Sequence, residues 1–268
     1  FSSKKQNKYL FSVIRGNGKI IYDSYYSLTL YANVIQELAK MPAAVQDVHL
    51  YSSSEDALFE ELRGIQSDAI VWLSPPQEYK KIIQRINEVR PVLTVDHLID
   101  GVSGIHPDLI DMGYQMGKEM LRRELRKPLI LQGKRYKADE FTGLKKAYSE
   151  AGVPLSELTY ICHSETDKIK QYFKSGKRPD SILFAYDYEL EILEILKESS
   201  IDLENSCRMV SSMYKPPMLN APMLLIPSRF DWLAKETAKF LRETLEDSES
   251  NSKHRLVKVI GLHSGELL

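Results

Sequence analysis

Short runs of branched apolar residues alternate along the chain with longer segments in which apolar residues recur every three or four positions. The runs have the length of buried strands, and the longer segments have the period of amphipathic helices. This alternation is typical of βαβ units, which build parallel sheets. The predicted strands are Tyr9–Ile14, Val48–Tyr51, Ala69–Leu73, Val92–Val95, Pro128–Leu131, Leu158–Cys162, Ser181–Ala185, Arg208–Ser211, Met223–Ile226 and Leu256–Ile260.

Eight helices are expected between these strands. In the last one, apolar residues from Phe230 to Leu245 follow i, i+3, i+4 spacing and define a single buried face. About ten strands exceed what one modest sheet usually holds, so we expect two sheets. The predicted helices are Ser27–Lys40, Ser54–Ile65, Gln77–Val89, Ile110–Glu124, Asp139–Ala151, Thr166–Ser175, Tyr188–Ser199 and Phe230–Glu246.

Composition limits the classes of function. The chain has 268 residues, enough for two lobes that each bury a core, and its formal net charge of −1 creates no field that would attract DNA. No apolar run is long enough to cross a membrane. Cys162 and Cys207 stand apart from each other and from any metal-ligand spacing, so we expect two reduced core thiols.

Motifs for cofactors and catalysis are missing from the sequence. Gly16-Asn17-Gly18 follows the first strand, but the third glycine of a dinucleotide site is missing, and we interpret the segment as a turn. No nucleophile elbow, zinc-protease motif or phosphate loop occurs. The histidines, including His97, His106, His163 and His254, form no pair with metal spacing. We therefore expect no cofactor, no metal and no catalytic residue.

Candidate ligand contacts follow from the predicted strand ends. In open parallel sheets a ligand lies beyond the carboxyl ends of the strands, so the polar and aromatic residues after each strand are candidates. The tyrosines between residues 22 and 26 have an alternative role at the start of the first helix, and Trp72, in mid-strand, is expected in the core. The candidates are Arg15, Tyr22, Asp23, Tyr25, Tyr26, Ser74, Asp96, Arg135, Tyr136, Asp187, Tyr188 and Met213.

Three stretches resemble the effector-binding domain of the LacI/GalR family of transcription regulators. The first runs from the helix motif GYQMG (113–117) through the strand LILQG (129–133) to the helix FTGLKKAYSEAG (141–152). The second is RPDSILFAYD (178–187), which is similar to the family's PDAIFAAND. The third is YKPPML (214–219), which resembles the family's Y-x-PP-LTT passage. Their order and spacing over roughly 200 residues make the resemblance specific.

The resemblance implies a fold of the periplasmic-binding-protein type I. This α/β fold has two Rossmann-like lobes with parallel sheets, which are joined by three crossovers and hold a ligand between them. Carried onto this chain, the first lobe takes residues 1–127 and 228–248, and the second takes 128–227 and 249–268. The chain would cross near Arg126, Ile226 and Asn251.

The resemblance also implies particular ligand contacts. Asp96 and Asp187 match family positions that hydrogen-bond ligand hydroxyls, Phe230 matches an aromatic contact, and Asp108 lies where many members place a ligand contact. A helix cap or a loop residue is the alternative for each aspartate. Three polar anchors of the family are changed, because Glu140, Tyr186 and Met213 replace an arginine, an asparagine and an aspartate. Lys134, Arg135 and Lys137 crowd the same region and would favour an acidic or phosphorylated sugar.

The resulting hypothesis is a cytoplasmic, homodimeric sensor domain that binds a small sugar-like effector and performs no chemistry. Because the chain begins at Phe1, we expect a DNA-binding module upstream that contacts the operator, of the helix-turn-helix type or of the GntR winged-helix type. Two alternatives stay open. One is a periplasmic solute-binding protein of a sugar transporter, with a signal peptide upstream, and the other is a doubly wound enzyme.

Overall fold

Two compact α/β units make up the chain. The structure is a computed structural model, and it describes residues 8–16, 25–52, 54–132, 139–162, 164–184, 190–203, 206–211, 223–225, 230–246 and 254–257. Within these, only the backbone is described for residues 25–27, 132, 190–191, 225, 230 and 254–257. The first unit comprises Phe1–Pro107 and Phe230–Val257, and the second comprises Asp108–Arg229 and Lys258–Leu268, so the chain passes between the units three times.

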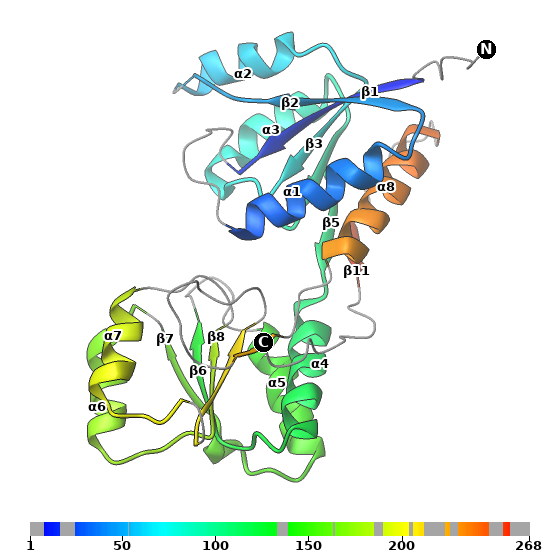
Figure 1. Ribbon diagram of the computed structural model, residues 1–268. Coiled ribbons are helices and arrows are strands. Elements are labelled where there is room, and N and C mark those ends of the chain that lie inside the picture. The colour runs from blue at the N-terminus through cyan, green and yellow to red at the C-terminus, as the bar shows by residue number, and fades with distance from the viewer. Residues whose placement is uncertain are drawn as a thin grey trace, which may run out of the picture. The chain divides into compact units, whose positions relative to one another are not determined.

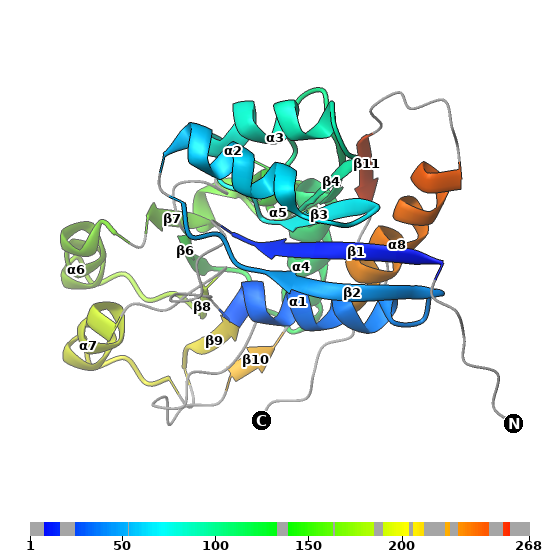
Figure 2. The same cartoon turned by 90° about the horizontal axis from the view of Figure 1, so that it is seen from above.

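The first unit is built on a six-stranded parallel sheet with the order β11-β5-β4-β3-β1-β2 (Figure 1). Helices cover both of its faces, with α2 and α3 on one side and α1 and α8 on the other (Figure 2). The elements are β1 (Tyr9–Arg15), α1 (Tyr25–Leu38), β2 (Ala43–Val48), α2 (Glu55–Gly64), β3 (Ala69–Leu73), α3 (Lys80–Asn87), β4 (Val92–Val95), β5 (Ser103–Pro107), α8 (Phe230–Glu246) and β11 (His254–Val257).

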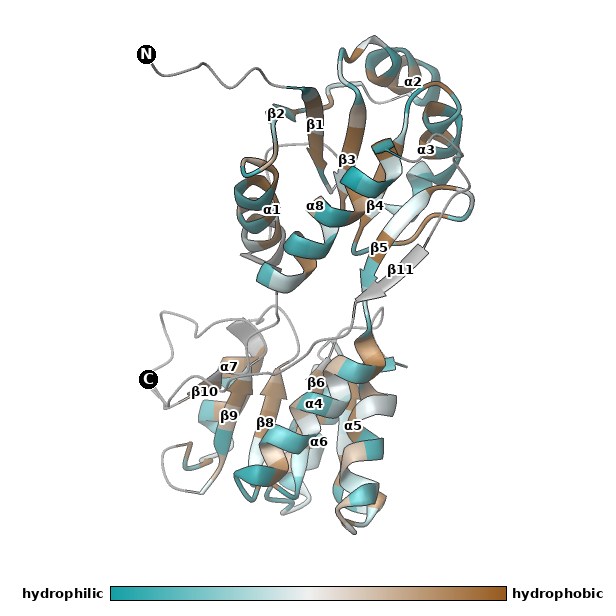
Figure 3. Cartoon of the chain, turned by 90° about the vertical axis from the view of Figure 1, so that its right-hand side faces the viewer, coloured by the Kyte–Doolittle hydropathy of each residue, from teal (hydrophilic) through white to brown (hydrophobic). Residues whose placement is uncertain are grey.

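Central strands of this sheet are mainly apolar because both faces are covered. Along β3 every residue is buried, and the strand is drawn in hydrophobic colours in Figure 3. Ile70 and Trp72 point into the core formed with α2 and α3, together with Ile14 of β1. Trp72 is 1% exposed and donates its Nε1–H to the carbonyl oxygen of Gly16 at 2.7 Å, which confirms its expected place in the core.

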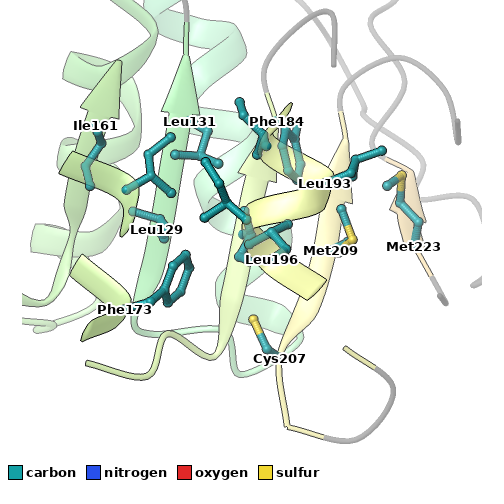
Figure 4. Packing of buried hydrophobic residues seen from close by; sticks show 14 residues of the cluster. Leu129, Leu131, Ile161, Phe173, Phe184, Leu193, Leu196, Cys207, Met209 and Met223 are labelled. Carbon is teal, nitrogen blue, oxygen red and sulfur yellow. The ribbon is translucent and has the colours of Figure 1, made fainter. Parts of the chain in front are cut away.

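The second unit contains a five-stranded parallel sheet with the order β10-β9-β8-β6-β7. Successive residues of β6 serve opposite faces: Leu129 and Leu131 pack with α6 and α7 (Figure 4), and Ile130 packs with α4 and α5. The elements are α4 (Leu109–Arg122), β6 (Pro128–Gln132), α5 (Asp139–Glu150), β7 (Thr159–Cys162), α6 (Thr166–Lys174), β8 (Ser181–Phe184), α7 (Leu190–Glu198), β9 (Arg208–Ser211) and β10 (Met223–Leu225).

Helices α4 and α5 approach each other closely because glycines line their contact. A Cβ atom on Gly113 would lie 1.9 Å from the carbonyl oxygen of Glu140, and one on Gly143 would lie 1.9 Å from that of Ile110. A Cβ on Gly117 would lie 2.8 Å from the Cβ of Ala147. The GYQMG motif therefore has a packing function, since it lets two helix backbones touch.

Boundaries between the units fall elsewhere than expected. We expected α4 in the first lobe, but its glycines pack it against α5, and the first passage follows Pro107 rather than Arg126. We expected the last strand in the second lobe, but β11 pairs with β5 in the first sheet. The second passage precedes Phe230, close to the expected position, and the third follows Val257.

Two strands also differ from their predicted positions. The second strand is Ala43–Val48, not Val48–Tyr51, and most of its residues are half-buried because it lies at the edge of the sheet. The strand Ser103–Pro107 was not predicted, since a segment that contains glycine and proline has no local strand signal. Gly104 is needed there, because a Cβ would come within 2.8 Å of the side chains of Leu98 and Thr94.

Tyr148 is a buried polar anchor of the second unit, and its removal should lower stability. Its hydroxyl donates to the carbonyl oxygen of Leu125 at 2.6 Å, and burial raises its pKa. Tyr148→Phe leaves that carbonyl in apolar surroundings, so we expect the free energy of unfolding to fall by about 1–2 kcal/mol. Urea denaturation measures the change. Tyr51→Phe, at a side chain that is 79% exposed, is the control and should have little effect; equal stability of the two variants would contradict the prediction.

Candidate ligand-binding site

Two residues at the carboxyl ends of β3 and β4 have unusual backbone conformations. Ser74 has a φ of 48° and Asp96 a φ of 77°, in the left-handed region that residues with a side chain rarely adopt. Backbone hydrogen bonds from Ser74 to Val95 (2.8 Å) and from Asp96 to Ile105 (2.9 Å) hold both in place. Strain of this kind persists only where the surroundings impose it, and it is concentrated at functional sites.

The side chains of these two residues form a hydrogen-bonded pair. The Ser74 hydroxyl donates to Oδ2 of Asp96 at 2.7 Å, and Asp96 is only 2% exposed. His97 Nε2 lies 3.7 Å from the same oxygen, while its Nδ1 lies 3.0 Å from the carbonyl oxygen of Pro75. Since a carbonyl only accepts, Nδ1 carries the hydrogen in that contact. The arrangement fixes a carboxylate at the edge of the sheet, where it is able to accept hydrogen bonds from hydroxyl groups.

Arg15 ends the neighbouring strand β1, and its orientation is fixed by two contacts. Its Nη2 lies 3.2 Å from Oδ2 of Asp47 on β2, and its guanidinium lies 4.5 Å from the centre of the Tyr31 ring on α1. Burial, together with the Asp47 carboxylate, raises the pKa of Tyr31. A planar guanidinium held in this way presents its donors in a defined direction.

The order of the strands makes the carboxyl edge of the first sheet a candidate position for a ligand. From β1 the chain moves to β2 on one side and then to β3 on the other, so the direction of winding reverses between β1 and β3. Ligands of open α/β sheets bind at such a switch point, beyond the carboxyl ends. Arg15 and Ser74 flank it, and the N–H of Gly16 is bonded to the carbonyl oxygen of Leu73 across it at 2.8 Å.

The structure brings together three of the predicted contacts, Arg15, Ser74 and Asp96, at the edge of the first sheet. Asp108 caps α4 by accepting a hydrogen bond from the N–H of Asp111 at 2.9 Å, which agrees with the alternative role considered for it. For Tyr25, Tyr26 and Phe230 the backbone is described, at the starts of α1 and α8, but not the side chain. Seven predicted contacts lie outside the described residues: Tyr22, Asp23, Arg135, Tyr136, Asp187, Tyr188 and Met213.

Asp47 and Tyr31 were not predicted to be part of this site. Asp47 was overlooked because the second strand was predicted to start at Val48, which placed Asp47 before that strand instead of near its carboxyl end. Correct placement of β2 would have suggested Asp47, since it lies beside Val13 in the register and reaches Arg15. Tyr31, half-buried on α1, has no sequence signal of its own.

Several other expectations concern residues away from this edge. Cys162 and Cys207 are buried free thiols, as expected, and burial raises the pKa of Cys207 to about 12. Glu140, at the position of the family's arginine, is 6% exposed in the first turn of α5. The described residues contain no metal-binding group of three or more His, Cys, Asp or Glu side chains, and none of their helices has the length and apolarity to span a membrane.

Comparison with solved structures identifies the fold. The chain matches a complex of the transcriptional regulator CelR with cellobiose (TM-score 0.67, 16% identity, 96% of this chain and 82% of that one). It matches a LacI-family regulator from Enterococcus faecium with bound ribose (TM-score 0.61, 14% identity, 92% and 94%). It also matches the lac repressor dimer bound to operator and an anti-inducer (TM-score 0.63, 14% identity, 92% and 90%).

These likenesses establish the class of the fold. The chain has the periplasmic-binding-protein type I fold found in the cores of LacI-family regulators, with one parallel sheet in each unit. No family model matches the sequence, and a search of curated protein sequences finds no match. At 13–16% identity the structural likeness carries the fold, and the function is argued from the site.

Proposed function

We propose that this chain is the effector-binding part of a transcription regulator and that its ligand is a small polyhydroxylated molecule, a sugar or a sugar derivative. The observation that carries the proposal is the pair of Ser74 and the buried Asp96, both in left-handed conformations, beside the switch point of the first sheet. A buried carboxylate held in a fixed position recognises hydroxyl groups well, because hydrogen bonds to a charged acceptor are stronger than those between neutral groups. Ligand binding, and no chemical step, is the proposed activity.

Two further observations support this assignment. The CelR and Enterococcus structures contain cellobiose and ribose, and the lac repressor structure is a dimer on its operator. By analogy, the chain is proposed to act as a cytoplasmic homodimer and to contact operator DNA through a module outside this sequence. The expected closure of two lobes around the effector is the proposed signal, since a ligand shifts a conformational equilibrium by its differential affinity for the two states.

Thermal unfolding in the presence of candidate ligands tests the proposal. The panel contains neutral pentoses, hexoses and disaccharides, together with sugar acids and sugar phosphates. A ligand at a hundred times its Kd should stabilise the folded chain by about 2.7 kcal/mol, and calorimetry should then give one site per chain. If only sugar acids and phosphates stabilise the chain, the basic residues Lys134, Arg135 and Lys137 gain support as ligand contacts. A panel without a single stabilising member would refute the proposal.

The regulatory half of the proposal needs its own experiment. The complete protein is titrated with genomic fragments from its own upstream region, with and without the ligand found in the panel. A ligand-dependent change of fragment affinity by about tenfold, the size of a typical allosteric coupling, is expected. A complete protein that binds ligand but no DNA would reject the regulator and favour the transporter-associated alternative. Sedimentation should show a dimer.

A further inference from the structure

The loops that follow β3 and β4 are joined by the side chain of His97. Ser74 begins the first loop and Asp96 begins the second, and the two strands are neighbours in the sheet (Figure 2). From the second loop, His97 donates its Nδ1–H to the carbonyl oxygen of Pro75 in the first loop at 3.0 Å. Its Nε2 lies 3.7 Å from Oδ2 of Asp96. The ring therefore contacts both loops of the candidate site.

Ser74 adopts a backbone conformation that the sequence disfavours in two ways. Its φ is 48°, and the Cβ of a serine makes a positive φ costly. Ser74 also precedes Pro75, and a proline ring drives the residue before it toward extended backbone with φ near about −120°. The observed conformation therefore persists only because the surroundings of Ser74 impose it.

Hydrogen bonds hold Ser74 on both sides. On the side of the strand, its N–H donates to the carbonyl oxygen of Val95 at 2.8 Å. On the other side, Pro75 is buried, and its carbonyl oxygen accepts the hydrogen bond from His97. A change of Ser74 to extended backbone would move Pro75 and break this bond. The bond from His97 thus opposes the change that the proline favours.

The loop that carries His97 is a firm support for this contact. Ile99 and Val102 are 0% exposed and pack in the core formed with α2 and α3. Gln84 of α3 donates its Nε2–H to the carbonyl oxygen of Asp100 at 2.7 Å. Because the loop after β4 is fixed to the core and to α3, His97 is able to hold the neighbouring loop in place.

We propose that His97 is a positioning residue of the effector site. It holds Ser74 in the left-handed conformation in which the Ser74 hydroxyl donates to Oδ2 of Asp96 at 2.7 Å, and this bond orients the carboxylate for the hydroxyl groups of the effector. His97 acts through the carbonyl oxygen of Pro75 and not by contact with the effector. The inference rests on the function proposed for this site, but its conformational part can be measured without an effector.

Three variants of His97 separate the roles of its ring nitrogens. His97→Asn places an amide N–H near the position of Nδ1 and keeps a donor for Pro75, whereas His97→Gln places its amide near Nε2, and His97→Ala removes both. Nuclear magnetic resonance reads the conformation of Ser74 from its Cα and Cβ chemical shifts. We expect these shifts to move toward extended values in His97→Ala and His97→Gln and to stay in His97→Asn. Unchanged shifts in His97→Ala would overturn the inference, with or without a known effector.

Calorimetry with the effector found by thermal unfolding measures the consequence for binding. Loss of one oriented hydrogen bond in His97→Ala should weaken binding about tenfold, and His97→Asn should stay within about threefold of the original. Gln84→Ala is the matched control, because it removes another hydrogen bond between a side chain and the backbone of the same loop. It should leave affinity within about twofold.

Two results of the binding experiment would contradict the role of His97. Equal weakening in Gln84→Ala and His97→Ala would mean that general loosening of the loop, and not the contact with Pro75, lowers affinity. Tenfold weaker binding by His97→Asn with unchanged Ser74 shifts would mean that His97 touches the effector directly. A panel without any effector would reject the proposed function, while the Ser74 shifts would still decide whether His97 holds Ser74 in place.

Discussion

Replacing Gly143 with alanine is expected to destabilise the second unit by about 3 kcal/mol. The added Cβ would lie 1.9 Å from the carbonyl oxygen of Ile110 and 2.6 Å from the amide nitrogen of Tyr114. Both are backbone atoms of α4, so relief requires a shift of a whole helix rather than a rotation of one side chain. Such a shift opens the apolar core that α4 and α5 share with β6 and β8.

The two tryptophans of the chain allow this effect to be assigned to one unit. Trp72 and Trp232 both lie in the first unit, so their fluorescence reports on that unit, whereas circular dichroism reports on helices of both. In urea, Gly143→Ala should shift the circular dichroism transition to lower concentration more than the fluorescence transition. A variant whose circular dichroism transition matches that of the original chain would contradict the proposed close packing.

Gly64→Ala is the matched control for this glycine. Gly64 ends α2, its φ is not in the left-handed region, and no atom lies within 4 Å of a Cβ placed there. Alanine should leave stability unchanged or raise it by about 0.5 kcal/mol, because it restricts the unfolded chain. The contrast between the two variants separates the effect of close helix contact from the general effect of losing a glycine.

Strands buried on both faces were predicted accurately from the sequence. The predicted and observed limits of β3, β4 and β9 coincide, since each is a short segment whose apolar residues are buried on both faces of its sheet. β5 was not predicted, and β11 was predicted at the wrong position. The two strands pair with each other across nearly 150 residues of chain, and no local pattern sets their position. The helix α4 was assigned to the wrong unit for a similar reason, because its close contact with α5 depends on packing between segments that are distant in the sequence.

The candidate site residues could be located only where the strand limits had been predicted correctly. The place of Ser74 and Asp96 at the carboxyl edge of the first sheet could be predicted because the limits of β3 and β4 were predicted correctly, and the carboxyl-end rule needs only the strand ends. Their left-handed conformations could not be predicted, since nothing in the sequence marks a serine or an aspartate for strain. Asp47 was overlooked because β2 was predicted about five residues too late.

Asp96→Asn is expected to leave the chain folded and to weaken effector binding about a hundredfold or more. Asparagine tolerates the left-handed conformation that Asp96 adopts, with a φ of 77°, so the backbone should not change. The variant loses a buried charge, and hydrogen bonds to charged groups contribute about 1.5–3 kcal/mol each, so losing two of them accounts for a hundredfold change. Calorimetry with the ligand found by thermal unfolding measures the effect.

The control for Asp96→Asn lies in the same loop between β4 and β5. Asp100 has a side chain that is 82% exposed and pairs with Lys80, so Asp100→Asn makes the same chemical change without altering the buried edge of the sheet. Its ligand affinity should stay within about twofold of the original, because screened surface pairs contribute little. If Asp96→Asn bound ligand as tightly as Asp100→Asn while both remained folded, the carboxylate at the end of β4 would have no part in recognition. The strain at Ser74 and Asp96 would then require a purely structural explanation.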